Sequence, residues 1–180
     1  MSLPSVTQVL SPFSDFSGVR PEVLEHAAAR GTKVHAVCAA YAQGLWVPKL
    51  DPEVQPYFDS FRRWFDAMVD GEANGVELEV ISKAHGYVGH LDLAVSIRGD
   101  EGVSIIDIKT PATKNRLWSA QLAAYRVAYE EHWGRAAIRV ASLRLKKDGS
   151  RAIFDEYTTS AQDFAAFLSA LNAYRWFAVK

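Results

Sequence analysis

Cysteine is nearly absent from this sequence, since Cys38 is its only one. A single cysteine excludes an internal disulfide framework, a four-cysteine zinc site and an iron–sulfur cluster held by cysteine thiolates. A strong charge of either sign is also lacking, because 20 Lys and Arg face 21 Asp and Glu and leave a net charge of −1. Nucleic-acid-binding domains are often basic overall, so such a role would depend on local basic patches.

Long apolar runs are missing as well. No stretch of about 18 apolar residues could cross a bilayer. Residues 1–10 have no charged region followed by a long apolar run, as a secretory signal peptide would. We therefore expect a cytoplasmic protein without a membrane partner. Hydrophobic residues make up 49% of the chain, and its 180 residues suit a single domain over 1–180 with a sizeable core.

Hydrophobic periodicity predicts helices and strands in a mixed order. After an irregular lead-in over residues 1–20, we expect a helix from Pro21 to Gln43–Gly44, with a kink near Gly31–Thr32. A second helix follows from Asp51–Pro52 to about Val69. The remaining expected elements are strands at 76–82, 87–97 and 103–109, a helix at 117–132, strands at 137–146 and 153–158, and a last helix capped by Ser160 with Asp163.

The second and third strands bring charged side chains into apolar surroundings. Side chains alternate along a strand, so Asp107 and Lys109 project from one face. Asp92 lies on the neighbouring strand of the same hairpin. Such charges are costly beside isoleucine and valine unless they are compensated, and a divalent cation would compensate the acids. The alternative is a solvent-facing Asp92 and a surface ion pair between Asp107 and Lys109.

Five sequence elements occur in a fixed order and resemble one known family. They are Arg30-Gly31-Thr32-Lys33-Val34-His35, Glu79, Gly89-His90-Leu91-Asp92, Asp107-Ile108-Lys109 and Gln121-x-x-x-Tyr125. Together they resemble the PD-(D/E)XK nuclease superfamily, specifically its RecB-like exonuclease branch, which includes stand-alone phage and prophage exonucleases. The resemblance implies an α/β fold with a restriction-endonuclease-like α-β-β-β-α-β core. A mixed sheet would be flanked by helices, with an N-terminal helical region and a C-terminal strand–helix extension.

The resemblance also implies roles for individual residues. The metal ligands would be the side chains of His35, Asp92 and Asp107 together with the Ile108 carbonyl. Lys109 would position or activate the attacking water. Gln121 and Tyr125, one helical turn apart, would support the site. Carboxylate and carbonyl oxygens suit Mg²⁺ or Mn²⁺, and one histidine tilts the choice toward Mn²⁺. No iron–sulfur cluster is expected.

Several other residues are candidates for the site or for DNA contacts. Glu79 is preferred to Glu77 as a residue lining the site, and His90 shares the strand face of Asp92. Glu79 could instead be only a strand residue, His90 could have a structural or DNA-facing role, and His35 alone could be a packed core histidine. The candidate nucleic-acid contacts are Arg30, Lys33, Lys114, Arg116 and Trp118, of which Lys33, Lys114 and Arg116 could instead be solvated surface charges.

These observations predict a Mg²⁺- or Mn²⁺-dependent deoxyribonuclease. We expect an exonuclease that hydrolyses DNA from free single- or double-stranded ends in phage or prophage recombination or repair. Two alternatives stay open, a catalytically silent DNA-binding or assembly module and a structure-selective or restriction-type endonuclease. A second copy of the chain or a phage recombination protein also stays open as a partner.

Overall fold

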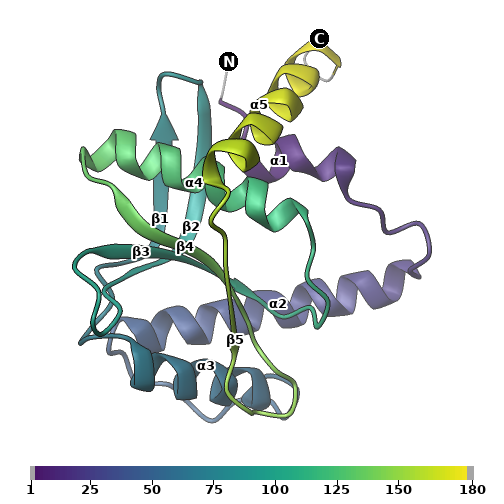
Figure 1. Cartoon of the computed structure of the whole chain (residues 1–180). Coiled ribbons are helices and arrows are strands. Elements are labelled where there is room, and N and C mark those ends of the chain that lie inside the picture. Colours follow the sequence, from purple (N-terminus) through teal and green to yellow (C-terminus); the bar gives the residue numbers. More distant parts are fainter. Residues whose placement is uncertain (1–2, 178–180) are drawn as a thin grey trace.

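A five-stranded mixed sheet forms the centre of the fold in the computed structural model, which describes residues 3–177 (Figure 1). The strands lie in the order β1-β2-β3-β4-β5; β3 and β4 run parallel, and the other neighbours run antiparallel. The predicted mixed α/β architecture is therefore confirmed. The strands are β1 (Gly75–Ser82), β2 (Tyr87–Val95), β3 (Val103–Lys109), β4 (Ala137–Arg144) and β5 (Ile153–Glu156). The helices are α1 (Val6–Leu10), the 3₁₀ turn η1 (Ser11–Phe13), α2 (Pro21–Ala42), α3 (Gln55–Met68), α4 (Leu117–Trp133) and α5 (Ser160–Phe177).

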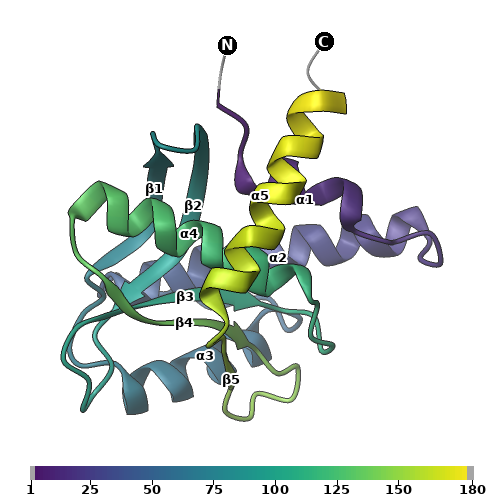
Figure 2. The same cartoon turned by 45° about the horizontal axis from the view of Figure 1, so that its top comes forward.

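Helices cover both faces of the sheet and bury a separate apolar cluster on each (Figures 1 and 2). The helices α2 and α3 enclose one cluster, which contains Phe61, Trp64 and Leu93. The other lies beneath α1, α4 and α5 and contains Tyr87 and Phe167. Burial on both faces explains why β3 reads as an almost continuous apolar strand, with six of its seven residues buried.

The long hairpin of β1 and β2 changes layers in its middle. In a regular strand, residues two apart share a face, yet Leu91 packs in the α4 layer and Leu93 in the α2–α3 layer. On β1 the same change occurs between Val76 and Leu78. On β1, Glu77 lies between the two residues that pack in different layers. It is the only described non-glycine residue with a positive φ, at 50°. On β2, Asp92 lies at the same level, because its neighbours Leu93 and Leu91 pair with Val76 and Leu78.

The N-terminal part of the chain is more regular than expected. Residues 1–20 contain α1 and η1, and Ser5 starts α1 through a capping box with Gln8. Val6 and Val9 are fully buried, so packing holds this short helix in place. The predicted kink near Gly31–Thr32 is wrong, because α2 is one continuous helix.

Other boundaries move by a few residues. The helix expected from residue 51 begins at Gln55, after a turn in which Asp51 accepts the first backbone bonds. At α5, Thr159 rather than Ser160 donates its hydroxyl to Asp163, because Ser160 already belongs to the helix. Among the described helices, none is long and apolar enough to cross a membrane.

Candidate active site

The two aspartates meet where the β2–β3 ladder ends. Leu93 of β2 and Ile106 of β3 form the last pair of this ladder. Asp92 and Asp107 lie next to these two residues, just beyond the paired part of the strands. Both carboxylates are buried, with 8% of Asp92 and 2% of Asp107 exposed. Asp92 Oδ2 accepts a 2.6 Å hydrogen bond from the backbone N–H of Ile108, which fixes this carboxylate against β3.

A second group of side chains holds Asp107. The Lys109 ammonium lies 2.5 Å from Asp107 Oδ2. No other polar atom of residues 3–177 forms a hydrogen bond with that buried oxygen. Lys109 also donates to Gln121 Oε1 at 3.0 Å. The Gln121 amide donates to the Tyr125 hydroxyl at 2.8 Å and, more weakly, to Asp107 Oδ1 at 3.4 Å. The expected pair on one side of α4 therefore faces the Asp-x-Lys strand.

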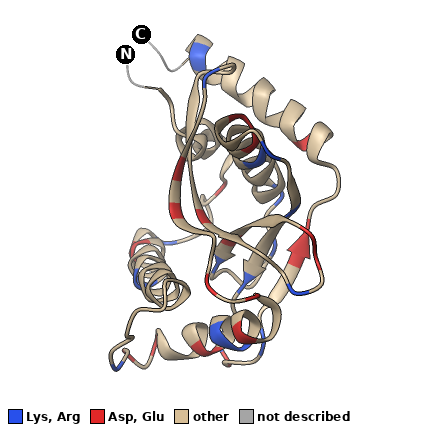
Figure 3. Ribbon diagram, turned by 90° about the vertical axis from the view of Figure 1, so that its left-hand side faces the viewer, with Lys and Arg blue, Asp and Glu red and all other residues tan. Residues whose placement is uncertain are grey.

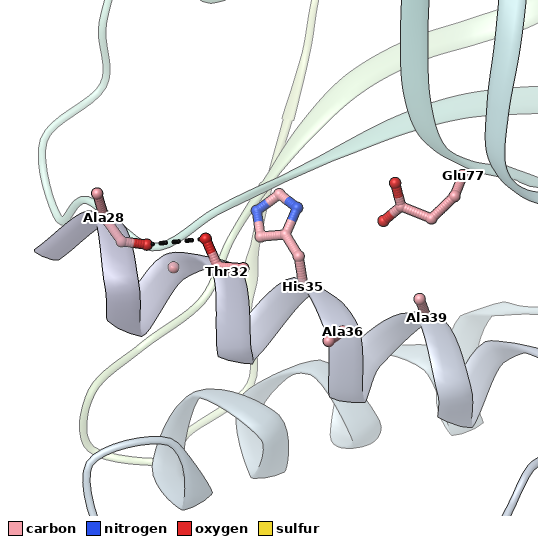
Figure 4. A pocket seen from close by; sticks show the side chains of 7 residues that line it. Ala28, Thr32, His35, Ala36, Ala39 and Glu77 are labelled. Atoms are coloured by element: carbon pink, nitrogen blue, oxygen red, sulfur yellow. Dashed lines mark hydrogen bonds between the residues drawn. The ribbon is translucent and has the colours of Figure 1, made fainter.

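A histidine and two carboxylates form a group next to this one. His35 on α2 points toward Glu77 on β1, as Figure 4 shows. The ligand atoms of His35, Glu77 and Asp92 all lie within 4.8 Å of one another, and His35 Nδ1 is 3.3 Å from Asp92 Oδ1. Asp92 thus joins the two groups, because it contacts His35 on one side and β3 on the other.

The electrostatics of this region favour a cation. Burial and, next, the charge of Asp92 raise the pKa of Glu77. Burial raises the pKa of Asp107 to about 6 although Lys109 opposes the shift. For His35, burial lowers the pKa, but the bond to Asp92 and the nearby acid charges outweigh it and leave that pKa raised. Each shift records crowded, poorly solvated negative charge.

The residues present fit a divalent metal ion. Oxygen and nitrogen ligands sit about 2.1 Å from ions such as Mg²⁺ or Zn²⁺, so ligands of one ion lie roughly 3–4 Å apart. The spacing of His35, Glu77 and Asp92 comes close to this requirement without an ion. Asp107 Oδ2 adds a buried carboxylate oxygen served only by the Lys109 ammonium among the described residues. A carboxylate-rich set with one imidazole suits Mg²⁺ or Mn²⁺.

The backbone carbonyl of Ile108 is placed on the same side as Asp92. The N–H and C=O of one strand residue point toward the same neighbouring strand, and the Ile108 N–H points at Asp92. The paired residues of β2 and β3 end at Leu93 and Ile106, so β2 offers this carbonyl no ladder partner there. The Ile108 carbonyl therefore stays a predicted ligand.

Glu79, the acid preferred from the sequence, lies outside the cluster. It is 59% exposed at its side chain and pairs with His90 at 3.1 Å across the β1–β2 ladder. The structure reverses the preference: Glu77 joins His35 and Asp92 because its positive φ turns it out of the strand alternation. His90 lines the pocket that contains both aspartates, while its ring contacts Glu79. A positive φ at glutamate leaves no signal in the sequence.

The candidate DNA contacts differ in their surroundings. Trp118 is 8% exposed, and its ring lies 5.5 Å from the Lys109 ammonium, so it supports that lysine from within the core rather than offering an open stacking surface. Lys33 pairs with Asp51 at 2.7 Å, and Lys114 lies 3.7 Å from Asp155. Arg30 stacks over a tyrosine ring, and Arg116 is exposed ahead of α4.

The comparison with protein families identifies the lineage. Residues 13–176, nearly the whole chain, match the family described as the PD-(D/E)XK nuclease superfamily. The chain belongs to that superfamily. No curated protein matches the sequence significantly.

Membership of this nuclease superfamily accounts for the clustering of these acidic and basic side chains. PD-(D/E)XK proteins are nucleases that typically use divalent metals, and DNA is the implied substrate. In this PD-(D/E)XK chain, one pocket of about 230 Å³, here called the catalytic pocket, is lined by the two aspartates, Lys109, Gln121 and Tyr125 together with His35. Ser5, Val6 and Thr7 at the start of α1 also line it. The N-terminal segment is held there by the bond from Val88 N–H to the Pro4 carbonyl, which measures 3.0 Å.

Proposed function

We propose that this protein is a DNA exonuclease of the RecB-like type, in which residues 1–180 act as one nuclease domain. The single observation that supports it best is the convergence of Asp92, Asp107 and Lys109 in one small pocket. Their burial costs folding free energy, and catalysis of phosphodiester hydrolysis gives that cost a purpose. The phage or prophage setting follows from the resemblance alone and stays a prediction.

The residues that would hold Mg²⁺ or Mn²⁺ are Asp92, Asp107, the Ile108 carbonyl and His35, and we add Glu77. A divalent cation in this position supplies a polarised water and positive charge at the scissile phosphate. The hydrogen bond from Ile108 N–H orients Asp92, so that its other oxygen faces His35. His35 must be unprotonated to act as a ligand.

Lys109 has the position of a transition-state group. Its ammonium is fixed between Asp107 and Gln121, and Trp118 shields it from one side. Held in this way, it can place positive charge beside a phosphate without reorganising during the reaction. Gln121 positions Lys109, and the Tyr125 hydroxyl accepts from Gln121 and so holds the amide in that orientation.

The exonuclease proposal rests on the size of the catalytic pocket. A space of about 230 Å³ suits a phosphate with part of its sugar, and the two aspartates that line it are buried. The start of α1 lines the same space. A strand that separates at a DNA end can reach the pocket, and this favours cutting from ends.

Plasmid topology tests the proposal. Supercoiled plasmid and the same plasmid linearised once are incubated with the protein in Mg²⁺, Mn²⁺ or EDTA. We expect degradation of the linear form alone, and only with a metal. Nicking or linearising of the closed circle at a similar rate would identify an endonuclease. No cleavage of either form, together with retained DNA binding, would identify a catalytically silent DNA-binding module.

A further inference from the structure

A second pocket, here called the basic pocket, lies beyond the C-terminal end of β3. It has a volume of about 510 Å³ and is lined by residues from α2, from the segment after β3 and from the β4–β5 turn. Its basic members are Arg30, Arg144, Lys146 and Lys147, and Thr110 adds a hydroxyl. None of these groups belongs to the catalytic pocket.

Three of the four cations have no acidic partner. Among residues 3–177, no carboxylate pairs with Arg30, Lys146 or Lys147, and the buried Arg30 Nε has no hydrogen-bond partner. Arg144 differs, because its Nε lies 2.5 Å from Asp155 Oδ2. Unpaired cations converging on one cavity favour an anionic ligand.

The one acid that lines the basic pocket is occupied locally. Asp148 Oδ1 accepts from both the backbone N–H and the hydroxyl of Ser150, at 2.9 and 2.7 Å. The hydroxyl bond and then the backbone bond hold the pKa of Asp148 below its usual value, so it stays charged as part of the turn. Lys146 also lowers that pKa through its charge, so it is balanced in part by Asp148. The charges of Arg30 and Lys147 remain, which leaves an excess of positive charge.

Backbone pairing ties the basic pocket to the catalytic strand. The parallel strands β3 and β4 end at the same edge of the sheet, and Leu145 N–H donates to the Lys109 carbonyl at 2.8 Å. Lys146 and Lys147 therefore follow directly after Leu145, whose backbone bonds to Lys109, the proposed catalytic lysine. On α2, Arg30 precedes His35 by five residues, about 7.5 Å along the helix axis. The basic pocket and the catalytic pocket therefore receive residues from the same stretches of chain and lie close enough to contact one DNA strand.

We propose that the basic pocket binds a non-scissile phosphate of the DNA strand, within a few nucleotides of the phosphate that is cut. The inference rests on the proposed nuclease function and specifies where the strand runs beyond the metal. Arg30, Lys146 and Lys147 contact the phosphate, and the Thr110 hydroxyl lies where it can donate to it.

The distribution of charge makes such a local site necessary. The net charge of the chain is −1, and Figure 3 shows acidic and basic residues interspersed along the ribbon. Phosphate affinity scales with the number of charges that are neutralised, so a surface of mixed sign holds a DNA strand weakly. A cavity in which cations outnumber acids provides local attraction for one phosphate.

The test compares charge-removing variants in the presence of Ca²⁺. The double variant Lys146→Gln/Lys147→Gln is compared with Lys83→Gln, which removes an exposed lysine at the opposite end of the molecule, in the β1–β2 turn. Folding of the double variant should be preserved, because Lys146 anchors its segment by a backbone N–H bond to Ser60 Oγ rather than by its side chain. Circular dichroism checks this directly.

For the double variant we expect about tenfold weaker binding of a 20-nucleotide single strand at roughly 0.1 M salt. The slope of log affinity against log salt should decrease by about 0.7 for each phosphate that the variant no longer neutralises. Lys83→Gln should match the wild type in both measurements. Equal affinity and equal slope in the two variants would overturn the proposal.

A phosphate scan locates the bound phosphate along the strand. Each phosphate of the oligonucleotide is replaced in turn by an uncharged methylphosphonate, and cleavage of the wild type is mapped against position. Besides the scissile phosphate itself, we expect one further sensitive position within a few nucleotides of the cut, and we expect that second sensitivity to vanish in the double variant. A scan that is the same for both proteins would refute the assignment while leaving the nuclease proposal intact. Absence of metal-dependent cleavage by the wild type would instead refute the proposed function.

Discussion

Two histidine–carboxylate pairs on neighbouring parts of the fold have the same chemistry and different surroundings. His90 and Glu79 are 3.1 Å apart, and their side chains are 57% and 59% exposed. His35 and Asp92 are 3.3 Å apart, but only 32% and 11% exposed. Distance therefore does not distinguish the pairs; burial does. Only the second pair lies beside further acids, Glu77 and Asp107.

The difference shows what makes a pair of residues into a site. In water, an ion pair such as Glu79–His90 contributes about 0–1 kcal/mol, and each partner can be satisfied by solvent instead. In the group around His35, Asp92 and Asp107 are buried and solvent neutralises them poorly, and the raised pKa of Asp107 records the resulting cost. A cation removes that cost, which makes the buried group a ligand set and leaves the exposed pair a surface feature.

The largest expected effect comes from removing one acid of the buried group. Asp92→Asn should lower the cleavage rate by at least about a thousandfold, because it removes the carboxylate that joins the two halves of the site. Glu79→Gln, the matched change in the exposed pair, should leave the rate within about twofold of wild type. Initial rates on linear DNA in Mg²⁺ measure both. A rate for Asp92→Asn close to that of Glu79→Gln would remove the distinction between the pairs.

Glu77 and Glu79 both lie on strand β1, so substituting each of them tests which one binds the metal. Glu77→Gln should weaken metal affinity by about ten- to a hundredfold, the range seen when a group supporting a metal site is lost. Titration of cleavage with Mn²⁺ gives the half-saturating concentration, and Glu79→Gln again serves as the control. An unchanged Mn²⁺ requirement in Glu77→Gln would place this glutamate outside the ligand set.

Much of this arrangement follows from local sequence patterns. Alternation places Asp107 and Lys109 on one strand face, and the four-residue spacing places Gln121 beside Tyr125. Both relations depend only on the regular geometry of one element. The order of the elements also follows from periodicity, because strands and helices differ in their repeat.

The features that sequence patterns missed depend on irregular backbone or on distant neighbours. Alternation assigns Glu77 and Glu79 to the same face, and only the positive φ at Glu77 separates them. The burial of Trp118 depends on packing around the start of α4. The basic pocket requires α2 to meet the β4–β5 turn, which are more than a hundred residues apart in the chain. The periodic spacing of residues within one helix or strand does not indicate such long-range contacts.

The pH dependence of metal binding should separate the half-buried His35 from the exposed histidines. The pKa of His35 is raised in the fold, and a proton on its ring competes with the metal. As the pH falls through that pKa, metal affinity should fall by about tenfold per unit for His35 alone, and protonation of Asp107 adds to the loss. At high pH both groups are deprotonated and affinity is greatest.

Isothermal titration with Mn²⁺ between about pH 6 and 8 measures this dependence. In His35→Asn the slope of log affinity against pH should decrease by about one proton. His26→Asn is the matched control, because His26 lies on the same helix and pairs with Glu53 at 3.2 Å, with side chains 62% and 63% exposed. Its slope should equal that of the wild type. Equal slopes in all three proteins would exclude His35 as a ligand.

The smallest expected effect comes from Gly89, which holds the buried group in place without touching it. A Cβ at Gly89 would lie 2.7 Å from Tyr125 Cδ1 and 3.2 Å from Val80 Cγ2, so alanine forces the tyrosine ring to move. Tyr125 is 2% exposed and cannot move freely, and its hydroxyl positions Gln121 and through it Lys109. Gly89→Ala should therefore cost about 1–3 kcal/mol of stability and several-fold in cleavage rate. Gly18→Ala, at a position with no atom within 4 Å, is the control for both measurements. Loss of stability with a fully retained rate would show that the tyrosine ring packs the core but does not position the lysine.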